Sequence, residues 1–206
     1  TLIKRRYHHL LDDTGQEFMF FVVDAVHQMQ TLLDDLLTYS RVNNNGSTQK
    51  VSVSDVLFMV RSNLKLDLEE QGGQLLVQED KLPVIQANQS QVIQLFQNLV
   101  SNAMKFRGKR APIVTIDCEQ QQDDLIFSIK DNGIGIPGDQ QQHIFEMFRR
   151  LHTKEEYEGS GIGLATCKRI VQNLGGQIWV ESTEGSGSTF YCSFPSSIVV
   201  EELVLA

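Results

Sequence analysis

The sequence predicts an α+β domain, built as a two-layer sandwich of a mixed, mostly antiparallel sheet with helices on one face and preceded by one long helix. Apolar residues recur at three- and four-residue steps over residues 14–42, which is helical spacing. Short alternating runs at 113–119 and 125–131 are typical of paired strands. Helix-like segments lie between such runs, so the two kinds of element can form two layers.

The composition is typical of a globular protein. The chain has 206 residues, of which 41% are hydrophobic and 21% charged, and its net charge is −8. This negative balance disfavours a nucleic-acid partner. No apolar run reaches the ~18 residues of a membrane span, so we expect no membrane contact in this chain and a cytoplasmic location. Cys118, Cys167 and Cys192 are widely spaced, which predicts reduced thiols rather than a disulfide or a metal site.

The helix predicted over residues 14–42 would be roughly 42 Å long. A small domain cannot bury one face of such a helix, so a helical hairpin or a dimer bundle is expected. Residues 43–47, Asn-Asn-Asn-Gly-Ser, have the composition of a linker. We therefore expect a helical segment at 1–43, a linker at 44–49, a globular domain at 50–195 and a tail of unassigned role at 196–206.

The globular part is expected to alternate strands with capped helices. Asn88 and Gln91 form a plausible capping pair at a helix start. The expected strands are 50–53, 74–78, 83–86, 113–119, 125–131, 178–182 and 189–194. The expected helices are 54–70, 88–106, 139–148 and 161–174.

One edge of the helix predicted at 88–106 carries amide and ammonium groups. Asn98, Asn102 and Lys105 follow one another at steps of four and three residues. An amide oxygen can ligate Mg²⁺ without repelling a triphosphate that shares the metal, and a lysine offsets phosphate charge. The pattern fits a metal–polyphosphate ligand, although a solvated helix face is the more common explanation when this edge is taken alone.

A carboxylate at a strand end precedes a glycine-rich turn. Asp131 can accept a hydrogen bond from the exocyclic amine of adenine, whereas guanine would present a carbonyl oxygen. Gly133 and Gly135 would let the backbone approach the ring closely, and a plain turn that needs glycine is the alternative. Residues 133–138 also fit G-x-G-x-x-G. We reject a dinucleotide site because Asp131 and Asp139 would repel a pyrophosphate and no acidic strand end follows at the required distance.

A second glycine cluster at 159–164 leads directly into a predicted helix. Backbone N–H groups at a helix start bind phosphates, and the absence of a following Gly-Lys-Ser/Thr excludes a P-loop. The polar, aperiodic residues 149–160 are expected to form a mobile lid over a bound nucleotide. Phe145 and Phe148 would anchor one end of that lid in the core.

Taken together, these motifs resemble those of the sensor histidine kinases of two-component signalling. That family shares its ATPase fold with gyrase, a heat-shock chaperone and mismatch-repair proteins. The stretches that resemble its N box, first glycine box, F box, second glycine box and closing hairpin are, in order, 98–106, 131–136, 144–148, 159–164 and 187–190. The long helix is similar to the second helix of the family's dimerisation and phosphotransfer hairpin. The sequences of the N box, the expected lid and this helix resemble those of bacterial phytochrome-like kinases.

The resemblance implies a histidine protein kinase that uses ATP and Mg²⁺ and passes the phosphoryl group to an aspartate of a response regulator. It implies three partners: a response regulator receiver domain, a second copy joined through the helical hairpin, and an upstream sensor domain. It implies Asn102 for Mg²⁺, Lys105 for the phosphates, Asp131 for the adenine amine and Thr189 near the adenine. The nucleotide-binding residues that it implies are Asn98, Asn102, Lys105, Phe106, Asp131, Gly133, Gly135, Ile136, Phe148, Gly159, Ser160, Gly161, Ile162, Gly163, Leu164 and Thr189.

The sequence departs from the family at the phosphoacceptor box, which reads roughly His-Glu/Asp-Leu-x-x-Pro-Leu and is matched nowhere in the 206 residues. His8 and His9 come where the first hairpin helix should be ending. We therefore expect the acceptor histidine upstream of Thr1, and a chain that binds ATP without phosphorylating itself. Two alternatives stay open: a superfamily ATPase that couples hydrolysis to a conformational change, and a non-catalytic dimerisation and docking module.

Overall fold

The computed structural model describes residues 11–42, 47–79, 82–151, 157 and 159–201. The expectations for His8, His9 and residues 202–206 fall outside these ranges. The helices are α2 (Asp13–Val42), α3 (Val53–Asn63), α4 (Lys65–Glu70), α5 (Gln89–Lys105), α6 (Gly163–Asn173) and the 3₁₀ helix η3 (Ser196–Ile198). The strands are β1 (Gln49–Ser52), β2 (Gln74–Val77), β3 (Val84–Ala87), β4 (Ile113–Gln121), β5 (Asp124–Asp131), β6 (Gln177–Thr183), β7 (Gly187–Pro195) and β8 (Val199–Glu201).

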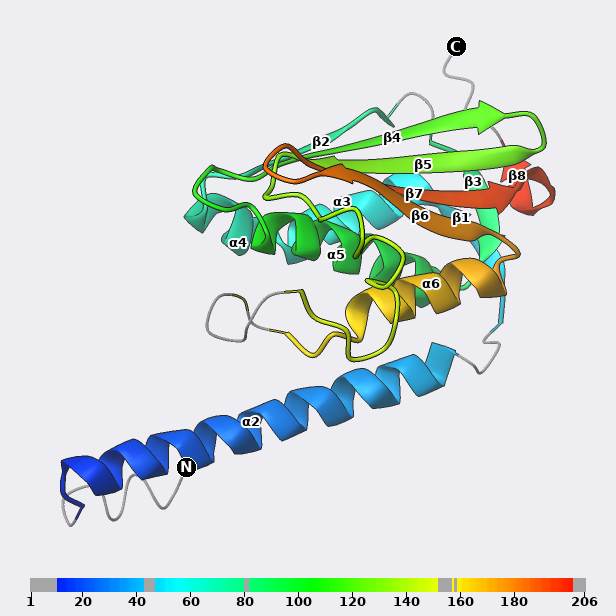
Figure 1. Ribbon diagram of the computed structural model, residues 1–206. Coiled ribbons are helices and arrows are strands. Elements are labelled where there is room, and N and C mark those ends of the chain that lie inside the picture. The colour runs from blue at the N-terminus through cyan, green and yellow to red at the C-terminus, as the bar shows by residue number, and fades with distance from the viewer. Residues whose placement is uncertain (1–10, 43–46, 80–81, 152–156, 158, 202–206) are drawn as a thin grey trace.

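The main sheet is mixed and mostly antiparallel, as the sequence predicts. Its strand order is β2-β4-β5-β7-β6, with only the β2–β4 pair parallel. A second sheet has the order β1-β3-β8. Figure 1 shows α3, α5 and α6 covering one face of the main sheet, and α2 lying beyond them on the side away from the sheet. The expected two-layer α+β architecture with a long preceding helix is therefore confirmed.

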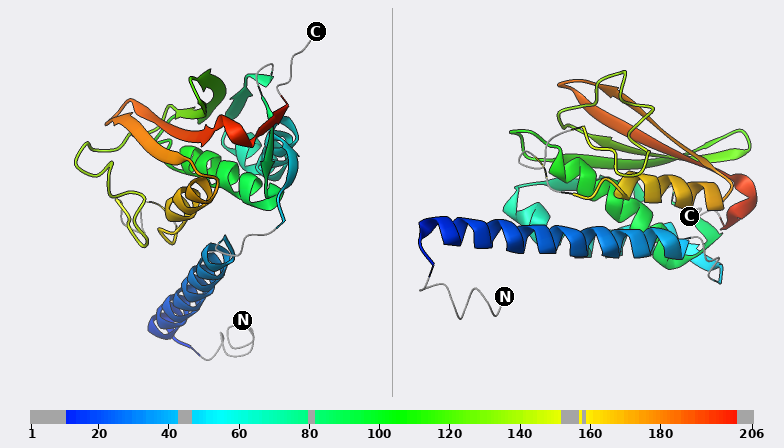
Figure 2. Two further views of the ribbon diagram at one scale, coloured as in Figure 1. Left: turned by 90° about the vertical axis from the view of Figure 1, so that its right-hand side faces the viewer. Right: turned by 60° about the horizontal axis from the view of Figure 1, so that its bottom comes forward.

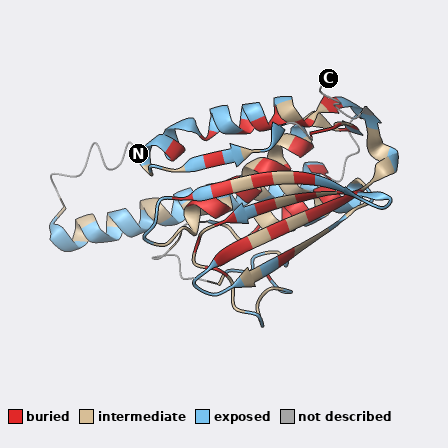
Figure 3. Ribbon diagram, turned by 90° about the horizontal axis from the view of Figure 1, so that it is seen from above, coloured by how far each residue is buried: buried red, intermediate tan, exposed pale blue. Residues whose placement is uncertain are grey.

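The core lies between the main sheet and helices α5 and α6. Inward-facing residues alternate along the strands, which Figure 3 shows as repeated buried bands. The rings of Phe96 on α5, Phe127 on β5 and Phe194 on β7 form an edge-to-face series, with centroids 5.4 and 5.9 Å apart. Such aromatic pairs bury large apolar areas, so they fix α5 against the middle of the sheet.

The start of α5 agrees with the predicted capping pair. The side chain of Asn88 accepts a hydrogen bond from the backbone N–H of Gln91 at 3.2 Å, which satisfies one of the unpaired donors of the first turn. The Gln91 side chain does not complete the box, because it points to the carbonyl oxygen of Val42 at 3.5 Å.

The helix predicted at 54–70 differs in two respects. It begins earlier, because Ser52 is the N-cap and its side chain accepts from the N–H of Asp55 at 3.2 Å. It is also two helices, since Leu64, with φ −98° and ψ 7°, separates α3 from α4. Leu64 and Leu68 are both buried, whereas Leu66 between them is exposed.

The short helix predicted at 139–148 is wrong. Residues 138–148 form a series of turns, in which N–H groups donate to the carbonyl three residues earlier, as from His143 to Gln140 at 2.9 Å. Phe148 has φ 62°, and its N–H donates to the carbonyl of Gly161 at 3.0 Å. A residue with positive φ cannot continue a right-handed helix. The N–H of Phe148 therefore bonds to Gly161, far along the chain, and not to a carbonyl of the preceding helical turn.

Candidate nucleotide-binding site

Helix α5 contributes an amide edge to a cavity of about 330 Å³. Asn98, Asn102 and Lys105 line this cavity, while Phe96 and Val100 on the opposite face of the helix are buried. The Nδ2 group of Asn98 donates to the carbonyl of Gly163 at 3.3 Å. This bond joins the amide edge to the first residue of α6, so two of the predicted motifs meet at one point.

Asp131 continues the inward-facing series of β5, whose other members are Leu125, Phe127 and Ile129. Its Oδ1 atom accepts from the N–H of Gly133 at 2.8 Å and from the N–H of Ser188 at 3.1 Å. Among the described residues no hydrogen bond engages Oδ2, and Asp131 lines the cavity. Oδ1 therefore fixes the carboxylate, and Oδ2 is the oxygen that can accept from a ligand.

The environment of this carboxylate perturbs its ionisation. Burial raises the pKa of Asp131 above its usual value, and the N–H donors of Gly133 and Ser188 partly offset that rise. Burial disfavours the charged form, whereas hydrogen bonds to that form favour it. A carboxylate that lines a cleft and whose pKa is raised by burial is a candidate for a group that binds a ligand.

The first glycine turn is required by the chain itself. Gly135 has φ 73°, and a Cβ there would lie 2.2 Å from the carbonyl oxygen of Thr183. A Cβ on Gly133 would lie 2.5 Å from the carbonyl oxygen of Phe106. The sequence predicts that a ligand ring lies close to the backbone of Gly133 and Gly135. In the structure the backbone of Phe106 and Thr183 lies there instead. Gly135 lines the cavity, and Gly133 does not.

The second glycine cluster lines the cavity along its whole length, from Gly159 to Leu164. Gly161 has φ 77°, and a Cβ there would come 2.9 Å from the carbonyl oxygen of Arg149. The hydroxyl of Ser160 accepts from the N–H of Ile162 at 3.2 Å, which orders the last turn before α6. The cluster therefore places the start of α6 in the cavity wall, and backbone N–H groups at a helix start suit an anionic group.

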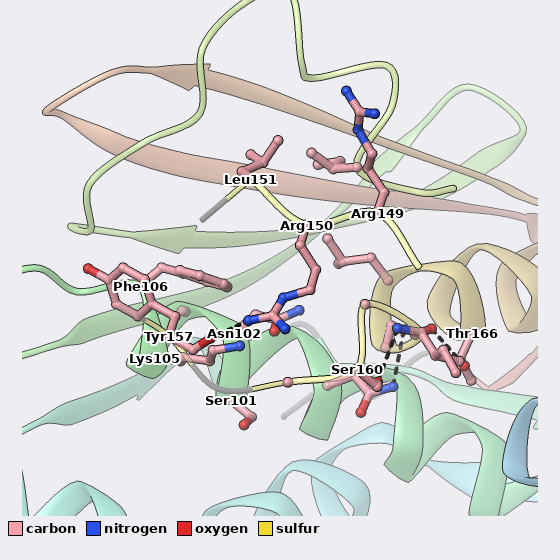
Figure 4. A pocket seen from close by; sticks show the side chains of 18 of the residues that line it. Ser101, Asn102, Lys105, Phe106, Arg149, Arg150, Leu151, Tyr157, Ser160 and Thr166 are labelled. Atoms are coloured by element: carbon pink, nitrogen blue, oxygen red, sulfur yellow. Dashed lines mark hydrogen bonds between the residues drawn. The ribbon is translucent and has the colours of Figure 1, made fainter. Parts of the chain in front are cut away.

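A cluster that the sequence did not predict closes another side of the cavity. Figure 4 shows Lys105, Phe106 and Tyr157 grouped together. The rings of Phe106 and Tyr157 have centroids 4.9 Å apart, and Lys105 Nζ lies 4.6 Å from the Phe106 centroid. Arg150 donates to the carbonyl of Tyr157 at 2.8 Å. Residues 152–156 and 158 of the expected lid lie outside the described residues.

Three predicted site residues do not line the cavity: Gly133, Phe148 and Thr189. Phe148 is 58% exposed, so only Phe145, whose ring lies 6.4 Å from that of Phe190, is anchored in the core as expected. Thr189 pairs with Lys130 in the sheet and alternates with Ser188 and Phe190, which do line the cavity. The two-residue period of β7 and the apolar character of Phe190 could have identified Ser188.

Every other predicted site residue lines the cavity. The lining residues that the sequence analysis did not name as binding include Ser101, Ile134, Ile144, Arg149, Arg150, Tyr157, Thr166, Ser188 and, from α2, Thr31, Asp35 and Thr38. No motif could have indicated the α2 group, because its place depends on how the long helix packs. None of the described helices is long and apolar enough to cross a membrane.

Residues 87–198 match the family model described as histidine kinase-, DNA gyrase B- and HSP90-like ATPase. The chain belongs to this ATPase family. It is 43% identical over 195 residues to the phytochrome-like protein Cph1 of Synechocystis sp., covering 94% of this chain and 26% of that protein. It is 44% identical to cyanobacterial phytochrome A of Nostoc sp., covering 94% of this chain and 25% of that protein. The chain thus spans about a quarter of the length of these relatives.

Solved structures share the fold at low identity. Full-length ShkA in complex with AMPPNP superimposes with a TM-score of 0.74 at 24% identity, covering 95% of this chain and 41% of that one. Histidine kinase ThkA in complex with the response regulator TrrA gives a TM-score of 0.67 at 21% identity, covering 94% of this chain and 55% of that one. Both matches extend over the long helix as well as the ATPase domain, so the whole architecture is that of histidine kinases.

Proposed function

We propose that this chain is the nucleotide-binding catalytic region of a sensor histidine kinase and that its cavity takes ATP. The observation that carries the proposal is the Asp131 carboxylate, which lines the cavity and whose Oδ1 is held by two backbone N–H groups. An acceptor fixed in this way matches the exocyclic amine of adenine and opposes the carbonyl oxygen of guanine. The complex of ShkA with AMPPNP, an ATP analogue, supports the same ligand.

The rest of the site suits a triphosphate. Lys105 supplies a cation, and the N–H groups before α6 supply donors at a helix start. The amide oxygens of Asn98 and Asn102 are the kind of hard oxygen donor that Mg²⁺ prefers, so the residues present fit this metal, with Asn102 as the expected ligand. When bound, Mg²⁺ would neutralise phosphate charge, and the role of these side chains would be to position the γ-phosphoryl group.

In this proposal the γ-phosphoryl group passes from ATP to a histidine nitrogen, leaving ADP, and then to a response regulator aspartate. The ThkA complex with its response regulator supports a receiver domain as partner. The exposed apolar residues of α2 support a homodimer formed through helical packing. An upstream sensor domain agrees with the greater length of the phytochrome relatives. A kinase that draws on cellular ATP would act in the cytoplasm.

Calorimetry with ATP and GTP, each with and without Mg²⁺, tests the proposal. We expect binding of Mg²⁺-ATP at one site per chain, with GTP at least tenfold weaker, since an unmatched acceptor costs about 1–3 kcal/mol. Equal binding of the two nucleotides would refute the role of Asp131. Steady phosphate release without transfer to an added phosphoacceptor hairpin would favour the ATPase alternative, and absence of nucleotide binding would favour the docking module.

A further inference from the structure

Helix α2 forms one wall of the nucleotide cavity. Thr31, Asp35 and Thr38 line the cavity together with Gln94 and Asn98 of α5. Steps of four and three residues place these three α2 side chains on one face of the helix. Most large apolar residues of α2 lie exposed on other faces, as Leu33 and Leu36 do. The helix therefore presents a polar face to the nucleotide site and an apolar surface elsewhere.

The end of α2 is bound by a clasp of side chains from two helices of the catalytic domain, α5 and α6. The carbonyl oxygen of Val42 accepts from the Asn173 Nδ2 group of α6 at 2.8 Å and from the Gln91 Nε2 group of α5 at 3.5 Å. Val42 itself is 2% exposed. These donors satisfy a carbonyl that a helix end otherwise leaves unpaired. Asp35 precedes Val42 by roughly two helical turns, so the clasp also sets the direction of the Asp35 side chain.

Asp35 is the anionic group on this face, while the two threonines use their only donor protons within the helix. The hydroxyls of Thr31 and Thr38 donate to the carbonyls of His27 and Asp34 at 3.1 and 2.7 Å. Among the described residues, no hydrogen bond or ion pair engages the half-buried Asp35 carboxylate. The other acidic side chain among the described lining residues is Asp131 on the sheet. Asp35 is therefore the carboxylate on the helix side of the cavity, away from the proposed adenine end (Figure 2 shows α2 against the helix layer).

We propose that Asp35 supplies a carboxylate to the metal side of the nucleotide site, so that the bound Mg²⁺-nucleotide holds α2 against the catalytic domain. This inference rests on the proposed function. Mg²⁺ sites on nucleotides typically combine one or two protein carboxylates with phosphate oxygens and water. The α5 edge supplies only amide oxygens, so α2 adds the anionic oxygen that the edge lacks.

The charge of Asp35 makes the effect depend on the metal. Without Mg²⁺, a carboxylate and a triphosphate repel each other, whereas a cation between them attracts both. Coupling between two binding events is reciprocal. If the docked helix strengthens Mg²⁺-nucleotide binding, the Mg²⁺-nucleotide must strengthen docking of the helix by the same factor.

The test compares Asp35→Asn with Asp34→Asn in the full chain. Asp34 is the exposed neighbour outside the cavity lining, so both variants remove one negative charge from the same helical turn. We expect Asp35→Asn to weaken Mg²⁺-ATP binding about tenfold, within the usual range of coupling, and to tighten the weak binding of ATP in excess EDTA. Asp34→Asn should match the wild type in both conditions. The readout for each variant is the ratio of its dissociation constant for ATP with Mg²⁺ to that for ATP in excess EDTA. A merely structural role of Asp35 would not change this ratio.

The clasp provides a second variant. Asn173→Ala removes the shorter bond to Val42 and frees α2 from the domain, so Asp35→Asn should have little further effect in that background. The inference would be overturned if Mg²⁺ changed the ATP affinity of Asp35→Asn and of Asp34→Asn by the same factor. It would also be overturned if Asp35→Asn bound Mg²⁺-ATP more tightly than the wild type. Failure of the wild type to bind Mg²⁺-ATP would instead refute the proposed function.

Discussion

At the scale of single residues, the Asp131 carboxylate links ionisation to nucleotide binding. Burial raises the pKa of Asp131, and the ionised form is the stronger acceptor for the adenine amine. We predict that ATP affinity falls as the pH is lowered from about 8 to about 5, because more of the carboxyl becomes protonated. Asp131→Asn should bind ATP at least about tenfold more weakly. Calorimetry of both proteins in the same buffers measures the affinities, and the comparison cancels the contribution of ATP's own titration. Parallel plots of ATP affinity against pH for the two proteins would contradict the prediction.

The same raised pKa predicts that the stability of the nucleotide-free protein falls as the pH rises, whereas ATP affinity falls as the pH is lowered. A folded-state pKa above the unfolded value gives stability that is present below the unfolded pKa and lost as the pH rises through the folded pKa. Without nucleotide, Asp131→Asn should therefore melt at a higher temperature than the wild type at pH about 8, with a difference that shrinks toward pH about 4. Thermal unfolding followed by circular dichroism measures this. A variant that melts lower at every pH would show that the carboxylate is needed for folding.

Ser188 and Thr189 form a matched pair on β7. Ser188 is buried, lines the cavity and donates its N–H to Asp131, whereas Thr189 lies on the other face of the strand. We predict that Ser188→Ala, which keeps this backbone N–H but removes the side-chain hydroxyl, weakens ATP binding by about threefold to tenfold, since a neutral hydrogen bond is worth about 0.5–1.5 kcal/mol. Thr189→Ala should leave the dissociation constant unchanged. Weaker ATP binding by Thr189→Ala, with no change in Ser188→Ala, would contradict the prediction and favour Thr189, the residue that the family resemblance indicates.

This pair also shows what sequence reasoning could reach. The resemblance indicates Thr189, whereas the structure places Ser188 and not Thr189 in the cavity lining; a motif gives an order of residues and not the face of the strand. Alternation with Phe190, Cys192 and Phe194, all buried, points to Ser188. At Asp131 the same alternation and the motif agree, so that residue was predictable.

At the scale of elements, the apolar surface of α2 is the largest unpartnered feature of the described chain. Met29, Leu33 and Leu37 are 57%, 59% and 54% exposed. We predict that Leu33→Lys lowers self-association, because a buried charge in a helix interface is costly. Light scattering after size exclusion measures the mass, with Gln30→Lys, at an exposed polar position of the same helix, as the control. Equal masses for the two variants would show that this surface does not join two copies.

Elements were predictable where local signals agree. Helix α5 has an N-cap, an amphipathic pattern and no breaker, and its predicted bounds differ from the structure by one residue at each end. The turns at 138–148 were misread because their apolar spacing at Ile144, Phe145 and Phe148 imitates a helix. What ends that pattern is the hydrogen bond from Phe148 to Gly161, a long-range contact that local spacing does not contain.

At the scale of the whole molecule, the cavity is assembled from segments far apart in the chain. The motifs predicted the parts that bring their own signature, such as the amide edge and the glycine turns. They could not predict the α2 wall, because no pattern at Gln91 or Asn173 indicates that their side chains bind the carbonyl oxygen of Val42. They also missed Tyr157, whose contact with Phe106 crosses the cavity. Contacts of this kind follow from packing and not from spacing.

The three cysteines report on the same packing. Cys118 on β4, Cys167 on α6 and Cys192 on β7 form no disulfide and are buried between the two layers. Burial raises the pKa of Cys167 to about 12 and that of Cys192 well above its ordinary value, so almost no reactive thiolate exists near neutral pH. Each thiol becomes accessible only when the sheet and the helices separate.

We therefore predict that a thiol reagent modifies none of the cysteines in the native protein at a rate faster than unfolding, and all of them after denaturation. Because ATP with Mg²⁺ binds the folded state alone, it should slow modification further by lowering the open population. Mass spectrometry over time resolves each thiol, and an Asp131→Asn variant, which binds ATP weakly, should lose this protection by nucleotide. Rapid labelling of Cys167 alone would mean that α6 opens by itself, and the two layers would then not unfold as one cooperative unit.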